Sequence, residues 1–335
     1  MSDSRLEIVN ILKENDDFLI ASHYNPDGDA LGSTAAMGFL CEALGKRFRL
    51  FNATGVPDAL SWLPLPGDML TSLSDLNGFT PGTFIIVDCG DPARVGKELH
   101  AALDPARTVN MDHHLGNPLF GAVNWVDPSK AAVGEMIALL AQDLDVPLTG
   151  SLGEAIYLAL VTDTGNFSYA NTRAETMEIG ASILRHGLSP HEFTDKLQNQ
   201  WTINRLQLWQ DVLADVRFYC GGRIGVVRIP SLTLLQTGTT TEDCEGLVEF
   251  IRRVKDVSVA VALRENVNAP GGAVKFSLRS KGSTNVQQIA RSLGGGGHRN
   301  AAGGQMDGPM DKAEDELVRA IVQGLDLGDH CLMEV

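Results

Sequence analysis

The architecture of this chain is set by the segment FLIASHYNPDGDALGS at residues 18–33. Its apolar start, Phe18–Ser22, is typical of a strand, and a polar turn, His23–Asp29, follows directly. A helical pattern then covers Asp29–Leu44 and ends at Gly45, a residue type that commonly terminates helices. A strand that leads through a short turn into a helix is the first half of a βαβ unit.

The alternation of short strands and helices continues along the first half of the chain. Further strands are predicted at Arg47–Ala53, Phe84–Val87 and Thr108–Met111, and helices at Ala131–Leu144, Leu152–Val161 and Thr172–His186. The run at 84–87 is apolar throughout, which is typical of a strand covered on both faces. We therefore expect residues 1–187 to form an α/β domain with a mostly parallel sheet flanked by helices.

A polar helical stretch separates this domain from a second one. Two pairs, Thr172 with Glu175 and Ser189 with Glu192, have the spacing of a capping box at a helix start. The helical pattern from the second pair onward makes residues 188–215 a helical linker. Residues 216–335 then form a smaller α/β domain, with strands at Arg223–Ile229, Ser258–Arg264 and Ala273–Arg279 and helices at Thr240–Val254, Asn285–Leu293 and Lys312–Leu327.

Charge and cysteine content narrow the classes of protein to consider. Lys+Arg 27 against Asp+Glu 42 gives a net charge of −15, which disfavours binding of long duplex nucleic acid through many phosphates. The sequence has no apolar run long enough to span a membrane, and its start lacks the features of a signal peptide, so we expect a cytoplasmic protein. Its five cysteines are dispersed, which predicts small buried thiols rather than disulfides or a thiolate zinc site.

Acidic residues and histidines gather at the ends of the predicted strands. HYNPDGD at 23–29 follows the first strand, DCGD at 88–91 follows the apolar strand, and DHH at 112–114 follows the next one. TDTGNF at 162–167 ends a predicted helix. Each segment alone has a structural alternative, namely a turn, a helix cap or a buried histidine pair. Because ligands bind beyond the carboxyl ends of parallel strands, we expect these segments to meet at one edge of the sheet.

The side chains in these segments predict a metal site. Carboxylates and imidazoles without thiolates suit Mn²⁺, Mg²⁺ or Fe²⁺. Three or more aspartates and two or more histidines exceed the needs of one ion. They match two ions, about 3.5–4 Å apart, that share a bridging carboxylate, as in many enzymes that cleave phosphoesters.

A glycine run in the second domain predicts a phosphate-binding segment. GGGGHRNAAG at 294–303 follows a predicted helix, and its four glycines allow backbone amides to approach an anion closely. Arg279 and His298 can add charge-assisted hydrogen bonds to phosphate. The alternative is a flexible loop without a ligand. The segment is not a Walker motif, because the Gly-Lys-Ser/Thr ending is missing.

Taken together, these motifs resemble the DHH phosphoesterase superfamily. HYNPDGDALGS, VDCGD, MDHH and TDTGNF stand in the family's order, and FSLRS followed by GGGGHRNAAG is similar to its DHH-associated C-terminal domain. The resemblance covers essentially the whole chain. Within the superfamily, the compact two-domain form is similar to the RecJ-like branch that contains oligoribonuclease/pAp phosphatases and stand-alone cyclic-di-AMP phosphodiesterases.

The resemblance also implies a role for each site residue. The first of two metal ions is held by His23, Asp27 and Asp88. The second is held by Asp29, Asp88, His113 and Asp163, so that Asp88 bridges the two ions. His114 faces the scissile phosphate and, with Asp88, is assigned to catalysis. The substrate-binding set comprises Ser277, Arg279, Gly295, Gly296, Gly297, His298 and Arg299.

The activity implied in this way is hydrolysis of short oligoribonucleotides (nanoRNA) or 3′,5′-bisphosphate nucleotides (pAp) to mononucleotides, by attack of a water that two metal ions activate. Mn²⁺ is the expected ion, with Mg²⁺, Fe²⁺ or Co²⁺ as alternatives, and a homodimer is implied. A cyclic-di-AMP or pApA phosphodiesterase of the same fold is the main alternative function. An inorganic pyrophosphatase and a non-catalytic nucleotide-binding module rank below it, and the intact acidic ligand set argues against the latter.

Overall fold

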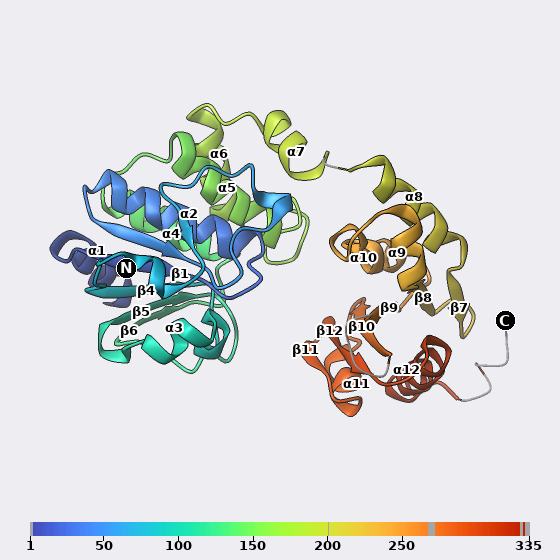
Figure 1. Cartoon of the computed structure of the whole chain (residues 1–335). Helices are drawn as coiled ribbons and strands as arrows, with labels where there is room; N and C mark the ends of the chain where they lie inside the picture. Colours follow the sequence, from blue (N-terminus) through green and yellow to red (C-terminus); the bar gives the residue numbers. More distant parts are fainter. Residues whose placement is uncertain (1–2, 200, 267–271, 329–330, 332–335) are drawn as a thin grey trace. The chain divides into compact units, whose positions relative to one another are not determined.

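A computed structural model describes residues 3–199, 201–266, 272–328 and 331 of this chain (Figure 1). The chain forms two compact units, Met1–Gln200 and Trp201–Val335, and each has its own six-stranded sheet and its own core. Within the described residues, no helix combines the length and the apolar character that a bilayer span requires. The domain boundaries at 187 and 215 stay a prediction.

The first unit is built on a parallel sheet. Its strands are β1 (Phe18–Ala21), β2 (Phe48–Phe51), β3 (Met69–Leu70), β4 (Thr83–Val87), β5 (Thr108–Asp112) and β6 (Val123–Val126). They lie in the order β3-β2-β1-β4-β5-β6, and every neighbouring pair is parallel, which confirms the predicted sheet. The order reverses between β1 and β4. In sheets of this type a ligand site lies beyond the carboxyl ends of the strands at such a reversal.

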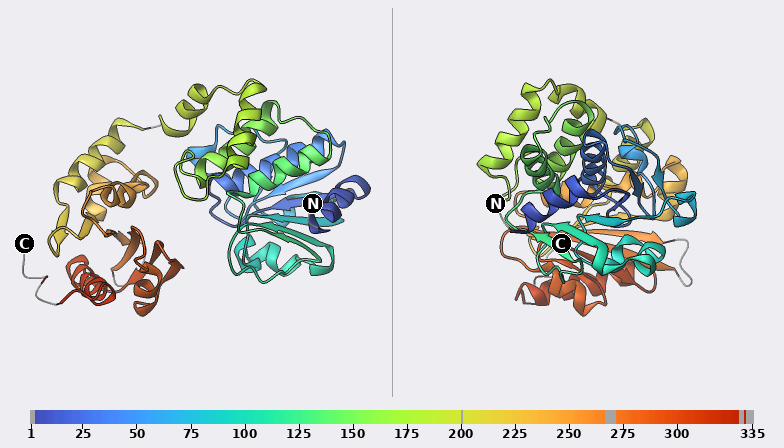
Figure 2. Two further views of the ribbon diagram at one scale, coloured as in Figure 1. Left: turned by 180° about the vertical axis from the view of Figure 1, so that it is seen from behind. Right: turned by 90° about the vertical axis from the view of Figure 1, so that its left-hand side faces the viewer.

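Helices cover both faces of this sheet. They are α1 (Asp3–Glu14), α2 (Gly28–Ala43), α3 (Lys97–Ala102), α4 (Val133–Asp143), α5 (Gly150–Asp163), α6 (Ala174–Arg185) and α7 (Pro190–Gln198). One face of the sheet packs against α2, α4 and α5, and the other against α3 (Figures 1 and 2). Gly32 lets α2 approach α5 closely, because a Cβ there would lie 2.6 Å from the carbonyl oxygen of Ala155.

The second unit has a mixed sheet with more strands than the three predicted. Its strands are β7 (Arg217–Tyr219), β8 (Ile224–Ile229), β9 (Val259–Asn266), β10 (Ala273–Ser280), β11 (Gly296–His298) and β12 (Ala301–Met306). They lie in the order β11-β12-β10-β9-β8-β7, and only the β8–β9 pair is parallel. The helices of this unit are α8 (Ile203–Ala214), α9 (Ser231–Thr237), α10 (Leu247–Arg252), α11 (Val286–Ser292) and α12 (Met310–Gly324).

Two of the strands that the sequence pattern missed contain the glycine run and the segment after it. β11 has the sequence GGH and β12 the sequence AAGGQM, which are residue types with little intrinsic preference for strands. Their pairing partners require small residues, since a Cβ at Gly303 would lie 2.7 Å from the carbonyl oxygen of Phe276. Residues 296 and 297 of the glycine run are therefore part of an edge strand.

Three local predictions are settled by the helix ends. Ser189 caps α7 by accepting a hydrogen bond from the amide of Glu192 at 3.4 Å, as predicted. The capping box at Thr172 is wrong, because α6 begins at Ala174 and the buried Thr172 hydroxyl has no hydrogen-bond partner in the part of the chain that the structure describes. The helix predicted at 240–254 is interrupted at Gly246, which has a φ of +91°, so that α10 begins only at Leu247. The stretch predicted as a linker contains α7 in the first unit and α8 in the second.

The cysteine prediction is partly wrong. Cys220 and Cys331 form a disulfide with an S–S distance of 2.10 Å. The two residues lie 111 positions apart in the sequence, so their spacing contains no sign of the pairing. Cys41 and Cys89 are buried free thiols, as predicted, and Cys244 is half-buried.

Candidate metal centre

The turn after β1 supplies the first acidic side chains of the site. Asp27 caps α2, and its Oδ1 accepts a hydrogen bond from the amide of Ala30 at 3.0 Å. Asp29, in the first turn of α2, is fully buried. Both of its oxygens lie at the start of α4, where the amides of Val133 and Gly134 donate to them at 2.7 and 3.1 Å. The position of Asp29 is therefore determined by two helix starts that are far apart in the sequence.

Asp88 follows β4 and lies at the middle of the site. Its φ of +51° is in the left-handed region, which a non-glycine residue rarely adopts and which is frequent at functional sites. Its Oδ2 lies 3.6 Å from Nε2 of His23, and its Oδ1 lies 3.5 Å from Nε2 of His113. The two carboxylate oxygens of one buried residue thus face two different histidines.

His113 follows β5 and points between three carboxylates. Its Nδ1 lies 3.2 Å from the carbonyl oxygen of Lys130, which favours a proton on Nδ1. Its Nε2 lies 3.2 Å from Asp163, 3.5 Å from Asp88 and 3.7 Å from Asp29. A histidine that donates through one ring nitrogen presents the other as a metal ligand.

His114 is oriented by a residue outside the predicted ligand set. Its Nδ1 lies 2.8 Å from Oδ1 of Asp112, the last residue of β5. Asp112 is fully buried, and its second oxygen accepts a hydrogen bond from Asn117 at 2.7 Å. Because Nδ1 of His114 contacts Asp112, its other ring nitrogen, Nε2, faces away from Asp112. Asp112 lies at a strand end, directly before the two histidines, and this position could have predicted its role in orienting His114.

The predicted metal ligands come together in one cluster. Three groups of side chains have ligand atoms within 4.8 Å of one another: His23, Asp27 and Asp88; Asp29, His113 and Asp163; and Asp88, His113 and His114. Asp88 belongs to two of the three groups. Its Oδ1 is buried without a hydrogen-bond partner among the described residues, as expected of an oxygen whose partner is a cation. The donor set therefore fits bound metal ions.

The charges of this cluster favour a cation between the side chains. Burial, together with repulsion from Asp88, raises the pKa of Asp29 well above its ordinary value, and the pKa of the more exposed Asp27 is also raised. Burial alone would lower the pKa of His113, but the carboxylates of Asp163 and Asp88 close to its Nε2 raise that pKa to about 12. Buried carboxylates that stay close together need compensating positive charge, and a divalent cation supplies it.

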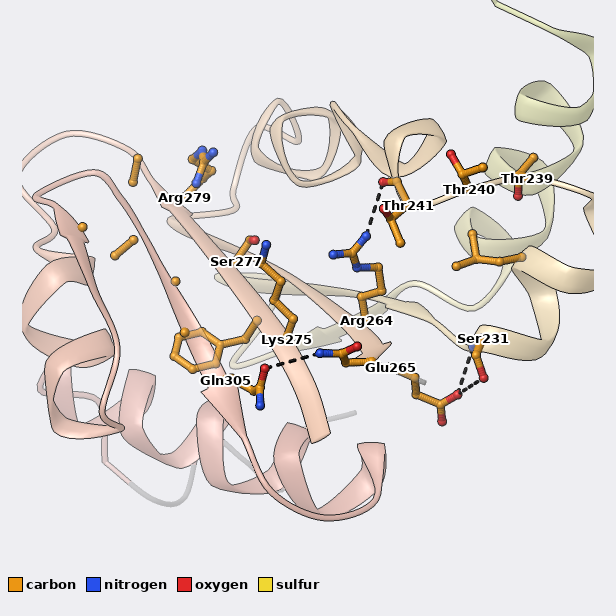
Figure 3. Close-up of a pocket in the computed structure, with 18 of the residues that line it drawn as sticks. Ser231, Thr239, Thr240, Thr241, Arg264, Glu265, Lys275, Ser277, Arg279 and Gln305 are labelled. Atoms are coloured by element: carbon orange, nitrogen blue, oxygen red, sulfur yellow. Dashed lines mark hydrogen bonds between the residues drawn. The ribbon is translucent and has the colours of Figure 1, made fainter. Parts of the chain in front are cut away.

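The predicted substrate-binding residues lie in the second unit, and four of the seven line a pocket of about 1280 Å³ (Figure 3). Ser277 and Arg279 of β10 line this pocket, together with Gly296 and Gly297 of β11. Nε of Arg279 also donates to Glu249 at 2.7 Å. Neither Gly295 nor Arg299 is among the lining residues. The side chain of His298 lies outside what the structure describes.

Two basic residues of this pocket were missed. Lys275 lies two positions before Ser277 on β10, and Arg264 is its cross-strand partner on β9. Alternate residues of a strand share one face, so Lys275, Ser277 and Arg279 point toward the same side (Figure 3). The period of two, counted back from Arg279, would have revealed Lys275. Leu232 and Leu235 of α9 also line the pocket.

Comparisons with known proteins agree with this architecture. The DHH family N-terminal domain matches residues 17–160, and the DHHA1 domain matches residues 222–325. A bifunctional oligoribonuclease and PAP phosphatase NrnA from Thermus thermophilus is 34% identical over 309 residues, which cover 91% of this chain and 89% of that protein. The NrnA protein of Bacillus subtilis is 26% identical, with 89% and 92% covered.

Two further proteins extend the comparison. The cyclic-di-AMP phosphodiesterase PdeA of Listeria monocytogenes is 25% identical over 94% of this chain but only 48% of its own length. The crystal structure of an exopolyphosphatase-related protein from Bacteroides fragilis has a TM-score of 0.86 and 25% identity, and the match covers 96% of this chain and 95% of that one. The expected resemblance is confirmed, and the chain belongs to the DHH family, with a DHH domain followed by a DHHA1 domain.

Proposed function

We propose that this chain is a metal-dependent phosphoesterase that hydrolyses short oligoribonucleotides and 3′,5′-bisphosphate nucleotides such as pAp to mononucleotides. The observation that carries the proposal is the clustering of six ligand side chains, one of which is Asp88, whose two oxygens face different histidines. The names of the relatives from Thermus thermophilus and Bacillus subtilis support the substrate class. We also propose that the protein acts in the cytoplasm as a homodimer.

The cluster is assigned to two divalent ions. His23, Asp27 and Asp88 would hold the first, and Asp29, Asp88, His113 and Asp163 the second. Mn²⁺ suits these carboxylate and imidazole ligands, with Mg²⁺, Fe²⁺ or Co²⁺ as alternatives. When bound, such ions lower the pKa of water and stabilise negative charge on phosphoryl oxygens.

The remaining residues of the site bind and orient the substrate. Asp112 holds the His114 ring, so that Nε2 of His114 can donate a hydrogen bond to a phosphoryl oxygen as its charge grows. Arg279, Ser277 and the glycines of β11, with His298 and Arg299, are proposed to bind a second phosphate or the terminal nucleotide. Lys275 and Arg264 extend this cationic surface along β9 and β10.

The direct test is product analysis with the purified chain. After EDTA treatment and dialysis, the protein is incubated with pAp or pApA, with and without Mn²⁺, and AMP is quantified by anion-exchange chromatography. We expect AMP from both substrates only when Mn²⁺ is present. If the protein binds Mn²⁺ but releases no AMP from either substrate, the proposal is wrong.

Two additional substrates distinguish the alternatives. Cyclic di-AMP turned over at least as fast as pApA would favour the cyclic-dinucleotide phosphodiesterase, which the likeness to the Listeria monocytogenes protein keeps as the second candidate. Release of phosphate from pyrophosphate at a higher rate than AMP from pAp would instead favour a pyrophosphatase. Binding of pApA without turnover of any substrate would favour a nucleotide-binding module.

A substitution in the pocket tests the substrate-binding assignment. We expect Arg279→Ala to raise KM for pApA at least about tenfold with little change in kcat, because a charge-assisted hydrogen bond to phosphate contributes about 1.5–3 kcal/mol. Arg319→Ala, an equal truncation at an exposed position of α12, is the control. An unchanged KM in the Arg279 variant would remove this residue from the binding site.

A further inference from the structure

A buried carboxylate outside the three ligand groups has an unusually complete set of hydrogen bonds. Glu135, in the first turn of α4, is fully buried. Its Oε1 accepts from Nζ of Lys130 at 3.0 Å and from Nη2 of Arg173 at 3.0 Å. Its Oε2 accepts from the hydroxyl of Thr176 at 2.8 Å and from the amide of Ala131 at 3.2 Å. Both oxygens are therefore satisfied, which a buried charge requires.

The donors keep this carboxylate ionised. Burial alone would raise the pKa of Glu135, but the hydrogen bonds from Lys130, Thr176 and Ala131 outweigh burial and hold the pKa below its ordinary value. Through its four donors, the ionised Glu135 links the segment before α4 to the start of α6, where Arg173 and Thr176 lie. Loss of the charge would leave buried donors without an acceptor.

The backbone held by Glu135 is the backbone that contacts two of the metal ligands. The carbonyl oxygen of Lys130 lies 3.2 Å from Nδ1 of His113. The amides of Val133 and Gly134 donate to the two oxygens of Asp29 at 2.7 and 3.1 Å. Residues 130–134 thus orient one histidine and one aspartate of the same ligand group.

The same segment also connects to the third ligand of that group. The carbonyl oxygen of Ala131 accepts from Nδ2 of Asn171 at 3.1 Å, and the same amide group donates to the carbonyl oxygen of Asp163 at 3.0 Å. Asn171 lies two residues before Arg173, whose side chain binds Glu135. His113, Asp29 and Asp163 are therefore all in contact, directly or through one side chain, with the backbone that Glu135 holds.

We propose that Glu135 is a positioning residue of the metal centre: it holds residues 130–134 in the conformation that orients His113, Asp29 and Asp163 around one ion. This inference rests on the proposed metal dependence. Glu135 itself does not face the ligand atoms of the cluster, so it acts through the backbone and not as a ligand. Partners that orient metal ligands are commonly worth 10–100-fold in metal affinity.

The test compares two equal changes at two buried glutamates. Glu135→Gln keeps the size of the side chain but replaces one acceptor oxygen with an NH₂ group that faces donors. Glu314→Gln makes the same change in the second unit, where Glu314 is 2% exposed and accepts from Tyr219 at 2.7 Å and Arg217 at 3.2 Å. Mn²⁺ affinity of the full-length chain is measured from the EPR signal of free Mn²⁺, with thermal unfolding of the metal-free protein measured in parallel.

We expect Glu135→Gln to weaken Mn²⁺ binding at one of the two sites at least tenfold. Glu314→Gln should leave the Mn²⁺ affinity unchanged, even if both variants unfold at lower temperature. An affinity within twofold of the unsubstituted chain for Glu135→Gln would overturn the inference. Equal losses in both variants would also overturn it, because they would reflect general destabilisation. If the unsubstituted chain bound no Mn²⁺, the proposed function would fail, and this inference would fall with it.

A milder variant covers the case in which Glu135→Gln does not fold. Thr176→Val removes one hydrogen-bond donor to Oε2 of Glu135. It keeps the charge of Glu135 and the approximate size of the side chain at position 176. We expect a smaller weakening of Mn²⁺ binding, about two- to fivefold. We also expect the Mn²⁺ concentration for half-maximal activity to rise by the same factor, with kcat at saturating Mn²⁺ preserved. Unchanged Mn²⁺ binding in a folded Thr176→Val protein would count against the role of Glu135.

Discussion

Asp88→Asn is expected to abolish turnover of pAp and pApA, with a loss of at least about 10³-fold in kcat. One carboxylate oxygen of Asp88 faces His23 and the other faces His113, so an amide removes the shared negative ligand of both proposed ions. Asn is the suitable replacement because Asp88 has a φ of +51°, and Asn tolerates the left-handed region better than most residues. The measurement is steady-state kinetics at saturating Mn²⁺, with bound Mn²⁺ counted by EPR.

The fold should survive this substitution. Burial and repulsion from Asp88 raise the pKa of Asp29, but the neighbouring histidines hold the pKa of Asp88 itself below its usual range, so loss of the Asp88 charge removes favourable as well as unfavourable contacts in the metal-free protein. Circular dichroism without metal should match that of the unsubstituted chain, because Asp88 follows β4 and belongs to neither the sheet nor its apolar core. Asp91→Asn, the same change at an exposed position three residues later, should retain full activity. Normal turnover by the Asp88 variant would exclude the bridging role.

His114→Ala is expected to lower kcat about 10²–10³-fold while bound Mn²⁺ stays at the level of the unsubstituted chain. Nδ1 of His114 contacts Asp112 at 2.8 Å, and the opposite nitrogen is proposed to bind a phosphoryl oxygen. The loss should therefore appear in kcat and not in metal content. Kinetics and Mn²⁺ stoichiometry, measured on the same preparation, separate these two effects.

The metal count decides between two roles of His114. Its Nδ1 lies 3.6 Å from Asp88, so it also belongs to one of the potential ligand groups. Loss of one bound Mn²⁺ in the Ala variant would make His114 a metal ligand and contradict its assignment to the phosphate. His100→Ala, at an exposed histidine of α3, controls for the truncation itself and should leave both quantities unchanged.

The parallel sheet was predictable because its central strands are short apolar runs. β1 and β4 are buried along their whole length, and such strands have no polar face. β12 was missed for the opposite reason, since Ala301–Met306 contains two glycines and has few residues that favour a strand, although it pairs with β10 and β11. Its strand conformation comes from its neighbour and not from its own residues.

The disulfide and the interrupted helix show two other limits of sequence patterns. Cys220 and Cys331 lie at distant positions, and dispersed cysteines predict unpaired thiols. Gly246 interrupts a helical pattern with a φ of +91°, although a single glycine within a helix is often tolerated. Both outcomes depend on which segments pack together in the second unit.

In the candidate metal centre, too, local patterns predict some features, and contacts between distant segments determine others. Asp27, Asp88 and His113 follow strands or start helices, and parallel strands bring their carboxyl ends to one edge, so local patterns were sufficient to predict their convergence. The partners of Glu135 are different: Arg173 and Thr176 lie 38 and 41 residues away, and the amides that bind Asp29 lie 104 and 105 residues away. Periodicity and residue type describe a chain over a few turns, which is enough to locate strand ends and ligand types. Contacts between distant segments arise from how helices pack on the sheet, and they alone show how each ligand is held.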